Sequence, residues 1–445
     1  MKILFFILFL IQVSYSQPRG KWMDMEDPIL LLNQDYQQKF VDLPLKGKLD
    51  VRPWSDTYWA TYKGGISYRW VKAGTRDETM TYKILKKEDL SKMDIALLSP
   101  SEKYDIFMGD YNFTLTQMEK NRTEVMTNRA IPLWWGLCHD WAPATMIYNP
   151  PGPITVKNQD GIEIPFYASD IKALLLYNLE LQNEITKTHF MGSRCELKLP
   201  QLLEAFSFGK ISSDRFLKAI GKEECADMDA GAMHLALATS IGIRKTGFVM
   251  DKTRGNQIWN QPVYAYESKI LKSKAVKRIK KGEFPNLDVA KILTIQTNLV
   301  YVKEIEPNQD GKNNPIKSLS DLPYKYELFL NSNGNIIGGK WLSLERPDFF
   351  WRIEDPGFHP SFLPLAEIYK NSLPLSANEG RTLSKEQVKG LFKSTAKKII
   401  NARRVFRNSN EVTVAREISK KEYYERLKFK MIKRVKETGS NLLAP

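Results

Sequence analysis

The chain has 445 residues, and its hydrophobic content of 42% is enough for a sizeable core in one large domain or two. It has no low-complexity tract, and no stretch after residue 16 is long and apolar enough to predict a membrane span. The formal net charge of +15 suits an acidic partner, but no nucleic-acid-binding motif accompanies it, so we expect no nucleic acid.

Residues 1–16 have the pattern of a secretory signal peptide. Lys2 is followed by an apolar run at 3–13, and Ser14 and Ser16 supply a small-x-small cleavage site. The run is short for a membrane span, although a retained anchor is the alternative. We therefore expect a mature protein that is secreted, or periplasmic, after removal of this peptide.

The segment 136–143, of sequence GLCHDWAP, places a cysteine at the start of a predicted helix. Proline is tolerated in the first turns of a helix, so Pro143 predicts a helix that begins at about Cys138. The positive end of the helix macrodipole favours the thiolate, which is the nucleophilic form of cysteine. Cys138 is therefore a candidate nucleophile, and a small buried structural cysteine is the alternative.

The three cysteines of the chain are an odd number, so an exported protein keeps at least one thiol free. A disulfide between Cys195 and Cys225 would leave Cys138 as the free thiol. The alternative is that no cysteines pair.

The segment 231–239 alternates large and small apolar residues around His234. This period of two predicts a half-buried strand with His234 on its less crowded face. A second strand at 247–251, reached through a turn near 241–244, would place Asp251 opposite His234 at hydrogen-bond reach. The alternatives are a core histidine and an exposed strand end.

Cysteine, histidine and aspartate are the residue types of a catalytic triad, in which they serve as nucleophile, base and orienting acid. A cysteine on a helix followed by a histidine on a strand is also the order of papain-like and transglutaminase-like folds. We therefore predict an α+β fold with the catalytic helix packed on an antiparallel sheet, and catalytic residues Cys138, His234 and Asp251. The indole N–H groups of Trp134 or Trp135 are candidate oxyanion donors, with core packing as their alternative.

Residues 376–445 form a basic segment with 18 Lys and Arg against 7 Asp and Glu. Its apolar spacing predicts helices, so we divide the chain into a signal peptide at 1–16, a catalytic domain at 17–375 and a basic helical extension at 376–445. The extension could dock on an acidic cell-envelope surface. A solvated helix face is the alternative.

The chain resembles the transglutaminase elicitor family, secreted enzymes of oomycete plant pathogens that are also present in bacteria. The most specific matches are the GLCHxWAP pattern at 136–143 and the sequence WNQPV at 259–263. Weaker matches are GAxH at 231–234, segments at 53–59, 99–110 and 346–351, a helix start at 170–174 and a hairpin at 333–341. Asp229-Ala230 departs from the Asn-Pro expected before GAxH, which affects local turn geometry.

The resemblance implies a cysteine acyltransferase that joins a protein glutamine to a lysine by an isopeptide bond. We expect the protein to be a monomer. It implies calcium as a possible cofactor, with ligands that the sequence does not identify, and no organic cofactor. Zinc is not expected, because consecutive side chains such as Cys138, His139 and Asp140 point in different directions on a helix. The alternatives are a secreted cysteine amidase or peptidase that acts on cell-wall peptide, and a surface-binding protein without activity.

Overall fold

The structure, a computed structural model, describes residues 22–71, 74–127, 129–193, 228–252, 257–276, 288–309, 318–343, 346–373 and 381–382. All of them belong to the first of two compact units, Met1–Leu391; the second is Phe392–Pro445. The predicted signal peptide, Cys195, Cys225 and nearly all of the basic extension lie outside the described residues. These three predictions therefore stay predictions.

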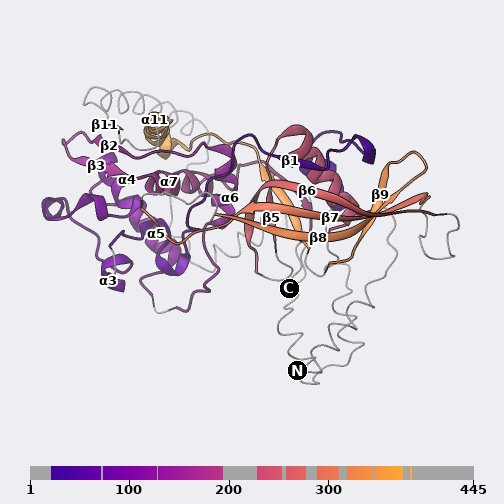
Figure 1. Cartoon of the computed structure of the whole chain (residues 1–445). Helices are drawn as coiled ribbons and strands as arrows, with labels where there is room; N and C mark the ends of the chain where they lie inside the picture. Colours follow the sequence, from indigo (N-terminus) through magenta and orange to yellow (C-terminus); the bar gives the residue numbers. More distant parts are fainter. Residues whose placement is uncertain are drawn as a thin grey trace, which may run out of the picture. The chain divides into compact units, whose positions relative to one another are not determined.

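The main element of the described part is an antiparallel sheet of eight strands (Figure 1). Seven of them follow the order β4-β10-β5-β6-β7-β8-β9, and β1 also pairs with β6. The strands of this sheet are β1 (Lys46–Lys48), β4 (Thr188–Gly192), β5 (Val249–Asp251), β6 (Asn260–Ala275), β7 (Lys291–Val302), β8 (Leu319–Leu330), β9 (Ile336–Trp341) and β10 (Phe349–Ile353). A smaller sheet joins β11 (Arg381–Thr382), β2 (Ile154–Lys157) and β3 (Glu163–Phe166).

The long central strands follow a period of two. In β7, Leu293, Ile295 and Leu299 are buried, whereas Gln296 and Asn298 between them are exposed. One face of the sheet therefore faces the core and the other faces solvent, as is common for antiparallel sheets.

The helices differ in length and in the surfaces that they bury. The described α-helices are α2 (Pro28–Leu32), α3 (Arg76–Thr79), α4 (Pro100–Met108), α5 (Thr114–Thr123), α6 (Cys138–Ile147), α7 (Ala168–Glu180), α10 (Ala230–Leu237) and α11 (Leu363–Ser372). A π-helix, η8 (Ala238–Arg244), continues α10, and short 3₁₀ turns are η1 (Asp24–Glu26), η2 (Phe40–Asp42), η3 (Thr61–Lys63), η4 (Gly65–Ser67), η5 (Lys87–Lys92), η6 (Ile95–Leu97) and η9 (Pro360–Phe362). In the described part, no helix is long and apolar enough to cross a membrane.

Several predicted elements are confirmed. A helix begins at Cys138, the strand predicted at 247–251 is β5, and the hairpin predicted at 333–341 joins β8 to β9. The helix start predicted at 170–174 lies in the first turns of α7, where Asp170 accepts a hydrogen bond from the backbone N–H of Tyr167. Helix α6 also packs on β6 and α7, so a cysteine-bearing helix does contact the antiparallel sheet.

The predicted strand at 231–239 is wrong. These residues form α10 and the start of η8, and β5 pairs with β6 and β10 instead. Asp229 caps the helix by accepting hydrogen bonds from the backbone N–H groups of Gly231 and Ala232. Ala, Met and Leu are strong helix formers, and a short apolar run does not by itself distinguish a strand from a buried helix.

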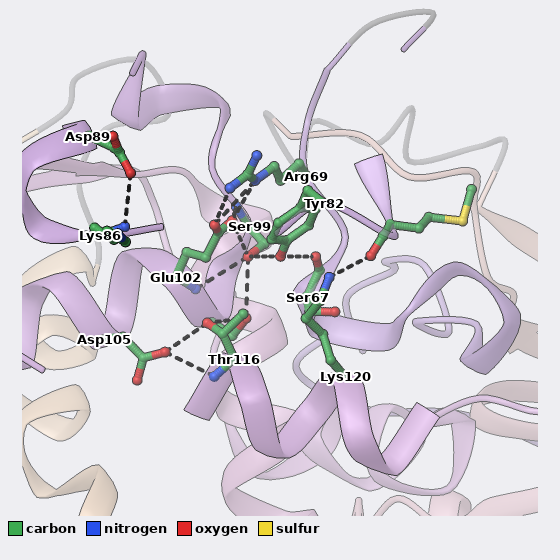
Figure 2. A network of polar contacts seen from close by, with 12 residues as sticks. Ser67, Arg69, Tyr82, Lys86, Asp89, Ser99, Glu102, Asp105, Thr116 and Lys120 are labelled. Carbon is green, nitrogen blue, oxygen red and sulfur yellow. Dashed lines mark hydrogen bonds and ion pairs between the residues drawn. The ribbon is translucent and has the colours of Figure 1, made fainter. Parts of the chain in front are cut away.

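A buried polar network fixes helices α4 and α5 (Figure 2). The Glu102 carboxylate accepts two hydrogen bonds from the Nε of Arg69 and one from its Nη2, and the Oγ of Thr116 donates to Asp105. Lys120 donates from Nζ to the backbone oxygen of Met80 and lies over the ring of Tyr82. Each buried charge therefore has polar partners. Thr116 and Lys120 hold α5 in place six and two residues before Arg122, whose charge acts on the candidate active site described next.

Candidate active site

Cys138 is the first residue of α6 and is 8% exposed. The loop before it is anchored by two backbone hydrogen bonds: Leu137 donates to the oxygen of Tyr58, and Thr61 donates to the oxygen of Trp135. The thiol is therefore held at a helix N-terminus by a rigid turn. This is the position that the sequence predicted for it.

Gly136 leaves no room for a side chain in this turn. A Cβ at this position would lie 2.5 Å from Cδ2 and 2.6 Å from the backbone oxygen of Tyr58. Gly136→Ala should therefore displace the turn, lower the free energy of unfolding by about 1–3 kcal/mol and reduce activity. Urea unfolding and an activity assay check this, with Gly152→Ala as the milder control, because its Cβ would lie 3.2 Å from the backbone oxygen of Ser372. Unchanged stability and activity would contradict the anchoring role.

Asn260, the first residue of β6, lies against the thiol. Its Nδ2 is 3.7 Å from the Sγ of Cys138, and its Oδ1 accepts a hydrogen bond of 2.9 Å from the indole N–H of Trp351 in β10. An indole N–H can only donate, so it fixes the orientation of the amide and directs the NH₂ group toward the sulfur. Trp351 is thus a positioning residue for a hydrogen-bond donor at Cys138.

Asp251 lies next to Asn260 across the ladder between β5 and β6. It is fully buried, and its Oδ1 accepts a hydrogen bond of 3.0 Å from the backbone N–H of Trp259. The structure therefore brings Asp251 to the strand residue that contacts Cys138. It does not bring Asp251 to His234, because β5 pairs with β6 rather than with residues 231–239.

His139 is the histidine beside Cys138 in the described part of the chain. Its Nε2 lies 3.1 Å from Oδ2 of Asp140 and 3.2 Å from Oε2 of Glu180, the last residue of α7. The exposed fractions of the side chains are 44% for His139, 1% for Asp140 and 22% for Glu180. We call these three residues the acidic histidine cluster.

The charges of this cluster support a protonated His139. Burial acts to lower the pKa of His139, but the charge of Asp140 and hydrogen bonds with Cys138 and Glu180 raise it well above its usual value. Burial acts to raise the pKa of Glu180, but His139 lowers it to about 2. Burial, opposed by His139 and assisted by Glu180, raises the pKa of Asp140 well above its usual value. An imidazolium paired with one carboxylate is therefore favoured at neutral pH.

Arg122 of α5 contributes a second positive charge near the cluster. Its Nε and Nη2 lie 2.6 Å and 2.8 Å from the two carboxylate oxygens of Glu119. The charge of Arg122 also acts to lower the pKa values of Glu180 and Asp140. The bidentate ion pair with Glu119 largely neutralises the charge of this guanidinium.

His234 lies elsewhere in the fold. Its Nδ1 is 2.7 Å from the hydroxyl of Tyr326, its ring stacks on Phe40, and burial lowers its pKa to about 4. Tyr326 bonds in turn to Thr297, and Thr297 to Ser268 in β6.

Ser268 is eight positions after Asn260 in β6, which is roughly 25 Å of strand at about 3.3 Å per residue. The structure therefore does not bring His234 together with Cys138. It places His234 in the core, which was the alternative for this residue.

The other predicted site residues have different outcomes. Trp134 and Trp135 pack edge to face with ring centroids 6.1 Å apart, and within the described residues neither indole donates a hydrogen bond to Cys138. Their role as oxyanion donors stays a prediction.

The acidic histidine cluster is the group of potential metal ligands found among the described residues, with its ligand atoms within 4.8 Å of one another. The argument that His139 and Asp140 point in different directions is therefore wrong, because Glu180 and Asp140 both meet the Nε2 of His139. One imidazole and two carboxylates do not fit calcium, which takes six to eight oxygen ligands. We derive no step through calcium.

The residues of this site that were not predicted from the sequence as functional include His139, Asp140, Glu180, Trp351 and Asn260. The signal for Asn260 was present in the sequence WNQPV at 259–263. Glu180 and Trp351 are far from Cys138 in sequence, and only the packing of α7 and β10 brings them to the site.

Comparisons with known proteins agree on the family. The family described as "Transglutaminase elicitor" matches residues 29–359. The crystal structure of the GP42 transglutaminase from Phytophthora sojae matches with a TM-score of 0.55 and 19% sequence identity, over 76% of this chain and 94% of that chain. A search of curated proteins gave no match.

The structural match shows that the chain has a mixed α/β fold with an antiparallel sheet like that of the GP42 transglutaminase. The family match spans well over half of the 445 residues and includes Cys138, Asp251 and Asn260. The chain therefore belongs to the transglutaminase elicitor family.

Proposed function

We propose that this protein is a protein-glutamine γ-glutamyltransferase that acts through the thiol of Cys138. The observation that carries the proposal is the position of this thiol, at the start of α6 between the amide NH₂ of Asn260 and the ring of His139. A thiol at a helix N-terminus beside an imidazolium is the arrangement that favours a reactive thiolate.

In the first half-reaction, the sulfur of Cys138 attacks the γ-carboxamide carbon of a protein glutamine. The carbon–nitrogen bond breaks, His139 gives its proton to the departing nitrogen, and ammonia leaves a thioester on Cys138. The Nδ2 of Asn260 is our preferred donor to the oxyanion of the tetrahedral intermediate, because Trp351 holds it toward the sulfur.

In the second half-reaction, a lysine amine attacks the thioester carbon. His139, now neutral, accepts the amine proton, and the carbon–sulfur bond breaks to give an isopeptide bond and the thiolate. Glu180 and Asp140 orient the ring and stabilise its charged form in both halves.

Aromatic residues in the segments that anchor the site support transfer to an amine rather than to water. The ring of Trp259 packs on that of Tyr58, with centroids 6.4 Å apart, and Trp351 contacts Asn260. The backbone oxygen of Tyr58 accepts the hydrogen bond from Leu137 before Cys138, and Trp259 directly precedes Asn260. Apolar walls of this kind reduce the access of water to a thioester.

The expected partners are two protein substrates, a glutamine donor and a lysine acceptor. We also propose that the protein works outside the cytoplasm as a monomer, with the basic segment 376–445 docked on an acidic cell envelope. The signal-peptide pattern at 1–16 supports the location, and the charge of segment 376–445 supports docking on an acidic surface.

Incorporation of a labelled primary amine into a glutamine-rich protein tests the proposal. Wild-type protein should incorporate the amine, and Cys138→Ala should not, because no thioester forms without the sulfur. The assay is run with and without added calcium, so that the cofactor expectation is tested at the same time.

Two outcomes would count against the proposal. Amine incorporation by Cys138→Ala would exclude Cys138 as the nucleophile. Release of ammonia or peptide that depends on Cys138, without amine incorporation, would instead identify a cysteine amidase or peptidase.

A further inference from the structure

We propose that the open edge of β6 is a docking surface for a membrane of anionic lipids. The surface consists of residues 45–48, 243–245 and 267–275, and we call it the basic edge surface. These residues belong to β1, η8 and β6 or directly adjoin them, whereas Cys138 and the acidic histidine cluster belong to α6 and α7. The inference therefore does not rest on the proposed function.

The apolar part of this surface begins where β6 meets the segment before β1. The backbone N–H of Ser268 donates a hydrogen bond of 2.7 Å to the oxygen of Leu45. Ile270 is two residues after Ser268 in the same strand, so Leu45 and Ile270 lie toward the same face of the sheet. The exposed fractions are 37% for Leu45, 45% for Ile270 and 50% for Leu271. Three large apolar side chains are therefore exposed within a short stretch of this edge.

The π-helix η8 adds a fourth apolar side chain at the same margin of the sheet. A Cβ on Gly242 would lie 2.5 Å from the Cγ of Pro44, so η8 packs directly on the segment before β1. Ile243 and Leu45 follow these two residues, and Ile243 is 47% exposed. Single exposed apolar residues are ordinary on a protein surface, but a group of them beside charged residues marks an interaction surface.

Lysines surround this apolar group. Glu267, which is opposite Lys46 in the ladder of β1 and β6, is the one acidic residue in the three ranges of the surface. The exposed lysines of the same ranges are Lys46, Lys48, Lys245, Lys269, Lys272 and Lys274. The basic edge surface therefore complements a negatively charged partner.

The backbone of β6 argues against a peptide strand as that partner. Residues 269–275 lie along β7 on one side, whereas the pairing with β1 on the other side ends at Glu267, and no strand in the described ranges continues it. The ladder with β7 has a bulge between Ile270 and Lys272, and lysines lie on both sides of this bulge. Bulges and edge lysines are the means by which open sheet edges avoid the addition of another strand.

The apolar side chains distinguish a membrane from a soluble polyanion. A polyanion binds through charge alone, so Ile270 and Leu271 would add nothing to its affinity. A membrane takes up apolar side chains at the boundary between headgroups and acyl chains, and its anionic headgroups attract lysines. Both kinds of side chain on one surface therefore favour anionic lipid.

Sedimentation of the full-length protein with lipid vesicles tests the inference. Wild type should bind vesicles of phosphatidylcholine and phosphatidylglycerol at least about tenfold more tightly than vesicles of phosphatidylcholine alone. Ile270→Thr combined with Leu271→Ser should weaken binding to the mixed vesicles by about tenfold. Met118→Thr replaces an apolar residue of α5 that is 48% exposed, so it is the matched control and should bind like wild type.

A second pair of variants tests the lysines. Lys272→Gln combined with Lys274→Gln should also weaken binding to the mixed vesicles by about tenfold, and added salt should reduce its difference from wild type. Lys83→Gln combined with Lys92→Gln changes the net charge equally at two exposed lysines outside the surface, and it should bind like wild type.

Three outcomes would overturn the inference. They are no binding of wild type to the mixed vesicles, wild-type binding in both the apolar and the lysine variants, and loss of binding in the lysine variant alone, which would assign the surface to polyanions. Without vesicles, all of these variants should incorporate amine like wild type. A protein that binds vesicles through this surface but has no transferase activity would separate failure of the proposed function from failure of the surface.

Discussion

A His139→Gln variant should lose about 100-fold or more of kcat for amine incorporation, because general acid–base catalysis typically contributes 10²–10⁴-fold. Glutamine keeps polar atoms near Asp140 and Glu180 but cannot carry a proton at neutral pH. The side chain of His139 is 44% exposed, so the substitution should leave the fold intact. Steady-state kinetics, with circular dichroism as a check on folding, measure this result.

The matched control is His234→Gln. His234 lies in the core and is linked through Tyr326 and Thr297 to Ser268, which is roughly 25 Å along β6 from the residue that contacts Cys138. The kcat of this variant should therefore stay within about twofold of wild type under conditions where it is folded. The opposite pattern, with activity lost in His234→Gln and kept in His139→Gln, would restore the Cys138, His234 and Asp251 triad. It would also contradict the placement of α10.

Acidification from pH 6.5 to pH 4 should destabilise the protein through His234 by about 3 kcal/mol, if its folded pKa is about 4. Burial disfavours the imidazolium in the folded state, so the unfolded state binds the extra proton in this range. The contribution is complete above pH 6.5, falls as the pH is lowered and is fully lost below about pH 4. Urea unfolding at a series of pH values measures the slope.

The same experiment with His234→Gln isolates this histidine from other groups. The variant has no ionisable group at this position, so its stability should fall less steeply between pH 6.5 and pH 4 than that of wild type. Its amide can still bond to the hydroxyl of Tyr326, which limits the loss of stability at pH 7. Parallel curves for the two proteins would show that the pKa of His234 is not lowered in the folded state.

The local parts of the fold could be predicted because their signals are local. The helix at Cys138 follows from Pro143, and the turn between β8 and β9 follows from the Asn and Gly residues at 331–335. The strand prediction for 231–239 was wrong because an alternation of large and small apolar residues is also compatible with a helix that is buried on all sides. The helix was decided by the Asp229 cap and by close packing of Gly231 on Gly338.

The parts of the site that have local sequence signals could also be predicted. Cys138 and Asp251 lie in segments whose sequence patterns mark them, and the structure places both next to Asn260. The predicted position of His234 beside Asp251 depended on pairing of a strand at 231–239 with the strand at 247–251. The structure has a helix at the first of these segments, so the two do not pair. The role of His139 was hidden because its partner Glu180 is 41 residues away, at the end of another helix.

The central claim is that acyl transfer passes through the sulfur of Cys138. Its most direct test is acid quenching of the enzyme shortly after mixing with a glutamine peptide and no amine, followed by mass spectrometry of the intact chain. The account predicts an adduct of the peptide mass minus ammonia, located on the peptide that contains Cys138, removed by hydroxylamine and missing in Cys138→Ala. Turnover without any such adduct, or an adduct that persists in Cys138→Ala, would contradict it.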